Sequence, residues 1–367
     1  MRVSNITLWS VDLTSHETYY MAEGKTCDTV ESHILCLETD TGMKGWGEVC
    51  PIPHYLPAFA KGVPSAIQEL APEIIGIMPT GVDAPMRKLD GFLIGHSYVK
   101  SIVDMALWDL FGQVTGLPLF DLLGGRTRKD MPLYHSITCI APDEMARIAK
   151  EAYETGIRQF QVKLGADADW QADAERLSKV REAVGSGPLV YGDWNCGATK
   201  LQATRTGRAV AHLDVMLEQP CGTLEDCAAV RQATGLPMKI DENAYDLASL
   251  MRAHELGCLD AVALKLSKFG GLSAMRRARD LTVQLGAEIC AECTWGSDIV
   301  TAASLHFAAS TPHGSLLNTC DLSSYVAPRV APNIPERSNG RIAPPEGAGL
   351  GVVPDLDVLG APILEIG

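Results

Sequence analysis

The sequence is poor in positive charge and has no long apolar run. Lys and Arg number 31 against 45 Asp and Glu, and the formal net charge is −14. Nucleic acid is bound by a basic stripe, so this balance excludes nucleic acid as a partner and disfavours an anionic membrane surface. No stretch of about 18 apolar residues predicts a membrane span. Residues 1–13 lack the basic start and apolar core of a signal peptide, and we therefore expect a cytoplasmic protein.

The 11 cysteines do not form the pattern of a disulfide framework or of a zinc site. Cys290 and Cys293 have the spacing of a redox pair or of half a zinc site, but no second pair and no nearby His pair completes a zinc cage. Both lie along a predicted strand. We interpret the cysteines as reduced, mostly packed thiols, with a redox or zinc role of this pair as the alternative.

The remaining composition is that of a globular protein. Of 367 residues, 46% are hydrophobic and 21% are charged, a length that suggests one large and one smaller domain. Alternating residues in 1–50 predict a small antiparallel sheet. A polar segment near 16–29 and a Pro-rich, aromatic segment at 50–59 are each either a lid or an ordinary surface loop. Apolar spacing predicts helices over 65–75, 85–93 and 97–116, the last capped by Ser97 and stopped by Gly116.

From Met131 onward, strands and helices alternate in the manner of parallel βαβ units. Eight strands are predicted, near residues 132–138, 158–163, 188–193, 214–218, 237–241, 260–265, 287–292 and 315–319. Eight units favour a barrel over an open sheet. The Pro- and Gly-rich tail after Tyr325 is expected to pack back on the N-terminal domain.

Charged residues stand at the ends of these predicted strands. They are Lys163, Asp193, Glu218, Asp241 and Lys265, at successive intervals of 30, 25, 23 and 24 residues. A strand, a loop and a helix occupy about that length, and the carboxyl ends of barrel strands meet at one mouth, where active sites are built. The sequence therefore predicts a site with three acids between two lysines.

The three carboxylates suit a divalent metal. Asp193, Glu218 and Asp241 offer hard oxygen ligands that suit an octahedral Mg²⁺ with open positions for substrate. Any one of them alone is equally explained as a structural carboxylate at a strand end. Asn195, two residues after Asp193, is expected to support the ligands. A lysine near a divalent cation has its pKa lowered, which suits Lys163 and Lys265 to act as bases.

With these residues the chain resembles the enolase superfamily, muconate-lactonizing-enzyme subgroup. The segments DWN, EQP and DEN match its three metal ligands, and Lys163 and Lys265 match its acid/base lysines on the second and sixth strands. The resemblance spans essentially the whole chain. It implies Mg²⁺, a homo-oligomer and an α/β fold: a modified TIM barrel of (β/α)7β type at 126–324, an α+β capping domain at 1–125, and a segment 325–367 that completes the capping domain.

Two departures from the subgroup bear on the tuning of Lys163 and on the substrate. The subgroup has Lys-x-Lys on the second strand, and here the first position is Gln161, so one positive neighbour of Lys163 is missing. Dipeptide epimerases have Asp-x-Asp after the eighth strand, where this chain has Asp321 alone, which disfavours a dipeptide. The segment AECTWG also lacks the histidine of mandelate-racemase-like members.

The expected substrate is a carboxylate with an acidic α-hydrogen and a cationic amine. Glu292 would pair with the amine and Trp295 would offer a cation–π face, unless Trp295 only packs against the next helix. Tyr55, in the aromatic segment 50–59, is a further candidate for substrate binding.

The segments QVKLGA, EQPC, KLSKFGG and WGSDIV resemble the proline-analogue branch of the subgroup, and its cis-3-hydroxy-L-proline dehydratases most closely. This implies elimination of water through an enediolate to Δ1-pyrroline-2-carboxylate, with 2-epimerisation of proline analogues as a side activity. The alternatives are a proline betaine or 4-hydroxyproline betaine 2-epimerase, and a non-catalytic barrel that serves as a binding protein.

Overall fold

The computed structural model describes residues 1–167 and 169–367. An antiparallel sheet contains β1 (Val3–Tyr20), β2 (Thr26–Thr39) and β3 (Lys44–Val49) in the order β1-β2-β3. The prediction of a polar loop at 16–29 is wrong. Both strands continue through it, and only the 3-10 helix η1 (Ala22–Gly24) joins them. Tyr19 and Cys27 are buried while their neighbours Tyr20 and Thr26 are exposed, and this alternation stabilises a strand despite the polar composition.

The C-terminal tail completes this sheet. Two of its short strands, β13 (Val326–Ala327) and β15 (Leu364–Ile366), pair antiparallel with β1. Between them lie β14 (Arg341–Ile342), which pairs with β4 (Met131–Pro132), and α13 (Leu356–Leu359). The prediction that the tail packs back on the N-terminal domain is confirmed.

Helices α1 (Gly62–Ile74), α2 (Asp83–Phe92), α3 (Ser97–Thr115) and α4 (Leu119–Leu122) follow the sheet. The N-cap of α3 is His96, with φ 52°, and not Ser97; Gly116, with φ 72°, ends the helix as predicted. Helix α3 is buried around nearly its whole circumference, because it packs against β3 and against two barrel helices, α10 (Leu266–Phe269) and α11 (Leu272–Gln284). Gly47 permits this approach, since a Cβ there would lie 2.0 Å from the Ile102 carbonyl oxygen.

The second sheet is an eight-stranded parallel barrel wall, in the order β12-β11-β10-β9-β8-β7-β6-β5. Its strands are β5 (His135–Ile137), β6 (Gln159–Lys163), β7 (Leu189–Asp193), β8 (Met216–Glu218), β9 (Met238–Ile240), β10 (Ala261–Lys265), β11 (Glu288–Glu292) and β12 (Leu316–Thr319). The ends meet beside β5, where Leu133 bridges Thr319 and the N–H of Tyr134 donates to the Thr319 carbonyl at 3.2 Å. The predicted first strand is therefore split into β4 and β5.

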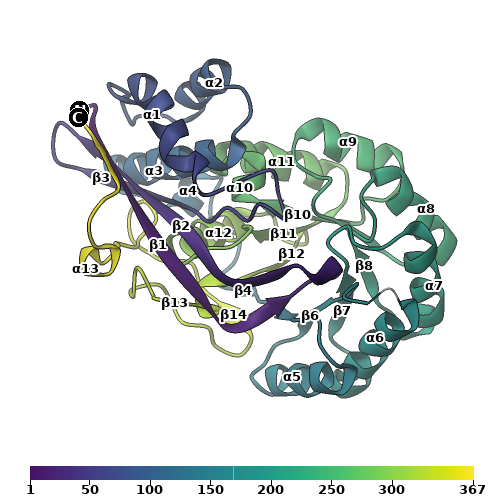
Figure 1. Ribbon diagram of the computed structural model, residues 1–367. Helices are drawn as coiled ribbons and strands as arrows, with labels where there is room; N and C mark the ends of the chain where they lie inside the picture. The colour runs from purple at the N-terminus through teal and green to yellow at the C-terminus, as the bar shows by residue number, and fades with distance from the viewer. Residues whose placement is uncertain (168) are drawn as a thin grey trace.

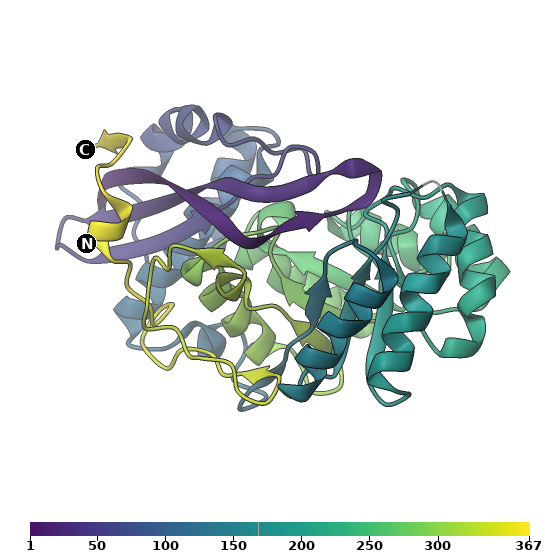
Figure 2. The same ribbon diagram turned by 60° about the horizontal axis from the view of Figure 1, so that its bottom comes forward.

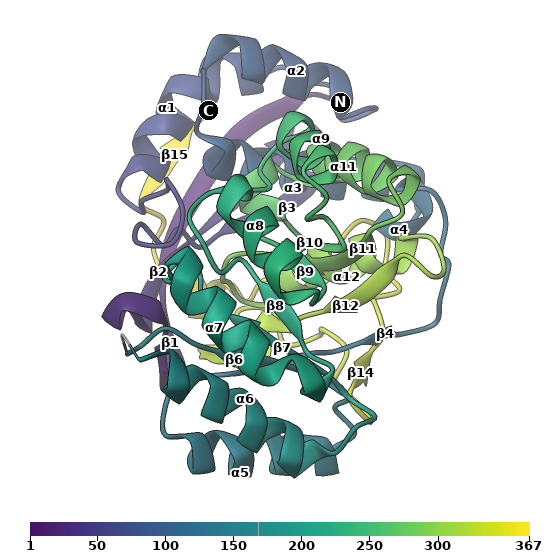
Figure 3. The ribbon, with the colours of Figure 1, turned by 90° about the vertical axis from the view of Figure 1, so that its right-hand side faces the viewer.

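Helices form the outer layer of the barrel (Figure 3). They are α5 (Pro142–Glu154), α6 (Trp170–Val184), α7 (Lys200–Val210) with η2 (Ala211–Leu213), α8 (Leu224–Thr234), α9 (Leu247–Glu255), the short α10 (Leu266–Phe269), α11 (Leu272–Gln284) and α12 (Asp298–Ser310). The last strand is followed only by the 3-10 helix η3 (Leu322–Ser324). The fold is thus the expected (β/α)7β barrel with a capping domain.

The hairpin of β1 and β2 reaches across the barrel from the capping sheet (Figures 1 and 2). At its tip the N–H of Glu23 donates to the Gly165 carbonyl at 3.0 Å, and the N–H of Cys139 donates to the Tyr20 carbonyl at 3.0 Å. The tip therefore covers the loops that follow β5 and β6. Of the helices in the described ranges, none has both the length and the apolar character to cross a bilayer. The 11 cysteines are free thiols, ten of them buried.

Candidate active site

The charged residues of the predicted ladder lie at one end of the barrel. Lys163, Asp193 and Glu218 end β6, β7 and β8 and are aligned with one another across the sheet. Lys265 ends β10 and is aligned with Glu292, the last residue of β11. Asp241 follows the last residue of β9. Since neighbouring parallel strands end together, these side chains from six strands share the barrel mouth.

Each of the two lysines is bound to an acid. Nζ of Lys163 lies 2.5 Å from Oδ2 of Asp193 and donates to Oδ1 of Asn195 at 3.0 Å. Nζ of Lys265 lies 2.7 Å from Oδ2 of Asp241. Burial alone would lower the pKa of Lys265, but the nearby carboxylates, Asp241 foremost, outweigh burial and raise it. The ammonium groups of the two lysines are therefore paired with different carboxylates, Asp193 and Asp241.

Two further residues at this end were not anticipated. Lys268 donates to Oδ1 of Asp241 at 2.8 Å and to the Ala263 carbonyl at 3.0 Å. Glu242 is reached by Asn195, whose Nδ2 donates to Oε1 at 3.1 Å. Burial, followed by the charge of Asp241, raises the pKa of Glu242 to about 8. Both residues adjoin recognised positions, in KLSK and DEN, which is the only signal that the sequence carries for them.

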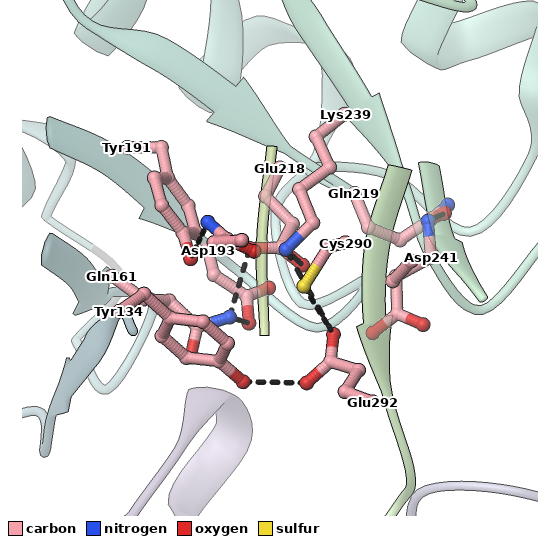
Figure 4. A network of polar contacts seen from close by, with 12 residues as sticks. Tyr134, Gln161, Tyr191, Asp193, Glu218, Gln219, Lys239, Asp241, Cys290 and Glu292 are labelled. Carbon is pink, nitrogen blue, oxygen red and sulfur yellow. Dashed lines mark hydrogen bonds and ion pairs between the residues drawn. The ribbon is translucent and has the colours of Figure 1, made fainter. Parts of the chain in front are cut away.

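Beneath the mouth, a polar network surrounds Glu218 (Figure 4). Nε2 of Gln161 donates to Oε2 of Glu218 at 2.8 Å and to Oδ2 of Asp193 at 3.1 Å. Nζ of Lys239 lies 2.9 Å from Oε1 of Glu218 and 4.7 Å from the ring centre of Tyr191. Burial raises the pKa of Glu218 to about 7, because the opposing effect of the Lys239 charge is smaller. Lys239 was missed, although a lysine within the buried strand MKI is itself an unusual feature.

Glu292 joins the same network. Its Oε2 accepts from the hydroxyl of Tyr134 at 2.5 Å, as Figure 4 shows, and its Oε1 lies 3.9 Å from Nζ of Lys239. Burial would raise the pKa of Glu292, but Lys265 and then Lys239 outweigh burial and lower it. Glu292 is thus a buried carboxylate that is kept anionic.

A cavity of about 50 Å³ lies against these residues. From the barrel it is lined by Gln161, Lys163, Lys265, Glu292 and Trp295, among others. From the capping domain it is lined by Tyr19, Met21, Cys27, Ile52 and Tyr55, so both segments considered as lids reach it. The hydroxyl of Tyr55 contacts Asp241 and Lys265. All three predicted substrate-binding residues line this one cavity.

Trp295 is buried between two other rings of the cavity wall. Its ring centre lies 5.8 Å from that of Tyr19 and 6.3 Å from that of Tyr325. Among the residues that the structure describes, no acceptor faces its indole N–H. A buried donor without a partner costs free energy unless a bound molecule accepts from it.

The donor set fits a divalent cation. The site contains five carboxyl groups, on Asp193, Glu218, Asp241, Glu242 and Glu292. Four lysine ammonium groups lie among them, on Lys163, Lys239, Lys265 and Lys268. Oε2 of Glu242 has no hydrogen-bond donor in the described part of the chain. In the conformation adopted, residues 1–167 and 169–367 contain no group of three or more His, Cys, Asp or Glu arranged to hold a metal ion. Their oxygens are instead bound by lysines, but the carboxylate oxygens of Asp193, Glu218 and Asp241 are hard donors of the kind that Mg²⁺ prefers.

Comparisons with known proteins cover the whole chain. Residues 5–124 match the family "Mandelate racemase / muconate lactonizing enzyme, N-terminal domain", and residues 144–358 match "Enolase C-terminal domain-like". A cis-3-hydroxy-L-proline dehydratase of Roseibium aggregatum is 39% identical over 365 residues, 99% of each chain. An N-succinyl-L-Arg/Lys racemase of Bacillus cereus is 27% identical, over 84% of this chain and 85% of the relative.

Solved structures agree over the same length. A member of the enolase superfamily from Roseovarius nubinhibens ISM superposes with a TM-score of 0.94 at 35% identity, covering 100% of this chain and 99% of that one. Another structure from this organism, complexed with magnesium, has a TM-score of 0.94 at 34% identity, with coverage of 100% and 99%.

Proposed function

Because the chain belongs to the enolase superfamily, with both domains of the mandelate racemase and muconate lactonizing enzyme group, we propose that it dehydrates cis-3-hydroxy-L-proline to Δ1-pyrroline-2-carboxylate. The relatives are dehydratases, epimerases and racemases, so the chain is an enzyme and not a non-catalytic binding protein. One observation carries the proposal. Lys163 and Lys265 reach the same small cavity from strands β6 and β10, and Glu292 lines that cavity as well.

Asp193, Glu218 and Asp241 are the residues that would hold Mg²⁺, on three successive strands. When bound, the cation would bind the substrate carboxylate and stabilise the negative charge that develops as the α-proton leaves. Gln161 and Asn195 orient two of these three carboxylates. Gln161 bridges Asp193 and Glu218, and the N–H of Asn195 donates to Asp193 at 2.8 Å.

The two lysines perform the proton transfers. In cis-3-hydroxy-L-proline the hydroxyl and the carboxylate share one ring face, so the α-hydrogen lies on the opposite face. One lysine, as the free amine, takes the α-proton, and the electrons of the C–H bond delocalise into the carboxylate to give an enediolate. The opposite lysine, as ammonium, protonates the hydroxyl; the enediolate electrons then form the double bond between the α- and β-carbons while the C–O bond breaks and water leaves. The enamine then tautomerises to the cyclic imine.

Glu292 and Trp295 would bind the secondary amine. Glu292 is kept anionic and is fixed by Tyr134, so that it pairs with a cationic nitrogen. The indole of Trp295 offers its π face, a contact worth about 0.5–2 kcal/mol. The cavity is small, which suits a single ring and no long side chain.

A second candidate is the 2-epimerisation of proline betaine or 4-hydroxyproline betaine. The opposed lysines favour it, because the second lysine can return a proton to the α-carbon from the far face when no 3-hydroxyl is present. The aromatic group of Tyr19, Trp295 and Tyr325 suits a quaternary ammonium.

The test is ¹H NMR of cis-3-hydroxy-L-proline, L-proline and proline betaine with the enzyme and Mg²⁺ in D₂O. We expect pyrroline-2-carboxylate from the first compound and α-deuterium exchange in L-proline. Exchange and inversion of the betaine with no elimination from the hydroxyproline would replace the dehydratase with the epimerase. Activity unchanged in excess EDTA would remove the metal from the proposal.

A further inference from the structure

Beside the reaction cavity lies a second one, and the two share a wall. The second cavity has a volume of about 220 Å³ and is lined by Ser15, His16, Glu17, Tyr19, His135, Trp295, Ser324, Tyr325 and Arg337. Tyr19, Trp295 and Tyr325 also line the reaction cavity. These three residues, the aromatic wall, are therefore what separates the two spaces.

The aromatic wall is assembled from three distant parts of the chain. Tyr19 comes from the end of β1, Trp295 from the loop after β11, and Tyr325 from the residue after η3. Both tyrosines are hydrogen-bonded to Ser136. The hydroxyl of Tyr19 bonds to Oγ of Ser136, and the backbone N–H of Ser136 donates to the hydroxyl of Tyr325 at 3.2 Å. The ring of Trp295 packs between the two tyrosines, with its centre 5.8 Å from that of Tyr19 and 6.3 Å from that of Tyr325, so the three rings form one partition.

Beyond the wall, the residues that line the second cavity include His16, Glu17 and Arg337. Arg337 holds Asp321 there with two hydrogen bonds of 2.7 and 2.8 Å. Asp321 is thus neutralised outside the reaction cavity and does not line it. The second cavity takes no part in proton transfer. It is space that a bound substrate cannot enter while the wall is intact.

We propose that the aromatic wall determines substrate size by excluding α-amino acids with a large substituent on nitrogen. The inference rests on the proposed function, in which Glu292 and Trp295 bind the amine; because Trp295 is itself part of the wall, a substituent on that nitrogen lies against the wall. A secondary amine or a small N-alkyl group fits in front of the wall. A longer group requires the space behind it, and that space becomes available when one ring of the wall is removed.

The experiment uses Tyr325→Ala, which removes a ring, and Tyr325→Phe, which keeps the ring and loses only the hydroxyl. The two probes are L-proline and N-benzyl-L-proline, which both have an α-hydrogen, a carboxylate and a cationic nitrogen. Deuterium exchange at the α-carbon is followed by ¹H NMR with Mg²⁺ in D₂O. We expect the ratio of N-benzyl-L-proline to L-proline exchange to rise at least tenfold in Tyr325→Ala and to stay at the wild-type value in Tyr325→Phe.

Failure of the wall and failure of the proposed function give different results. Wild-type enzyme that exchanges both probes equally, or a Tyr325→Ala enzyme that exchanges L-proline without gaining the benzyl compound, overturns the wall. Exchange of neither probe by wild type contradicts the proposed function alone; calorimetric binding of the two probes then decides on the wall by the same ratio. Tyr19→Ala, which opens the wall from β1, serves if Tyr325→Ala does not fold, with Tyr19→Phe as its control.

Discussion

The ammonium nitrogen of Lys239 lies 2.9 Å from Oε1 of Glu218, and neither side chain is exposed to solvent. An ammonium group buried in a barrel is costly unless it is fully compensated. Here the compensation includes Glu292 at 3.9 Å and the rings of Tyr191 and Tyr134 at 4.7 and 5.5 Å. One internal lysine thus balances a proposed metal ligand and a proposed amine-binding carboxylate together.

We expect Lys239→Met to destabilise the fold by about 3–5 kcal/mol, because it leaves the buried carboxylate of Glu218 without its counter-ion and removes one of the two lysines near Glu292. Urea unfolding measures this. Lys100→Met is the matched control: Lys100 is also buried, but its partner Asp90 is exposed, and a loss of about 1 kcal/mol or less is expected. The double variant Lys239→Met/Glu218→Gln should recover part of the stability. Lys239→Met as stable as wild type would show that the pair contributes nothing.

Asp241→Asn should reduce turnover at least about 100-fold, because one anionic ligand is lost where negative charge develops. It should also weaken Mg²⁺ binding measured by calorimetry, a readout that does not depend on turnover. The amide keeps the size of the side chain, and near-native unfolding would separate this effect from misfolding. Wild-type rates in Asp241→Asn would exclude this residue from the metal site.

Much of the fold could be predicted because its signals are local. The strand ends at Lys163, Asp193 and Lys265 and the stop at Gly116 follow from periodicity and from the αL preference of glycine. The hairpin tip was mistaken for a loop because Thr26 and its neighbours are polar, whereas the pairing of β1 with β2 and the contacts of the tip with the barrel loops, which stabilise the strands, are not visible in a local pattern. The burial of α3 on all sides is likewise set by tertiary packing that the amphipathic stripe did not indicate.

The candidate site divides in the same way. Residues at strand ends, such as Asp193 and Glu292, could be placed from spacing, since every barrel strand points its end at the mouth. Lys239 and Tyr134 could not, because they lie within apolar runs and their importance comes from partners on other strands. The ion pair of Asp321 with Arg337 joins residues whose relation no local pattern reveals.

Trp295→Ala should raise KM for cationic cyclic amines by about 2- to 30-fold, the equivalent of 0.5–2 kcal/mol of cation–π contact. Trp295→Phe should raise it less, since phenylalanine keeps part of the π face. Steady-state kinetics with cis-3-hydroxy-L-proline compares the two. Equal and negligible effects would leave Trp295 with a packing role between Tyr19 and Tyr325.

Stability should fall as pH rises through neutrality, owing to two buried acids of α3. Burial raises the pKa of Asp104 and of Asp109 to about 7 each. Their folded pKa lies above the unfolded value, so the stability they contribute is complete below about pH 4 and is lost as pH rises through 7. Thermal unfolding between pH 6.5 and 8.5 should show Tm falling by about 2 °C or more, and less steeply in Asp104→Asn and Asp109→Asn. A slope identical in wild type and both variants would contradict this assignment.

The last prediction separates the two lysines, which are bound to different acids, Lys163 to Asp193 and Lys265 to Asp241. The lysine facing the α-hydrogen of the L-substrate is needed for every reaction, so its replacement by Ala should abolish both elimination and α-deuterium exchange. Replacement of the opposite lysine should leave exchange on the L-isomer, while inversion is lost and elimination becomes slow, because the far-face proton has no donor. ¹H NMR of Lys163→Ala and Lys265→Ala in D₂O, with cis-3-hydroxy-L-proline and L-proline, distinguishes them. Equal loss of exchange in both variants, or normal epimerisation in either, would contradict a two-base site, since each face of the ring would then not depend on its own lysine.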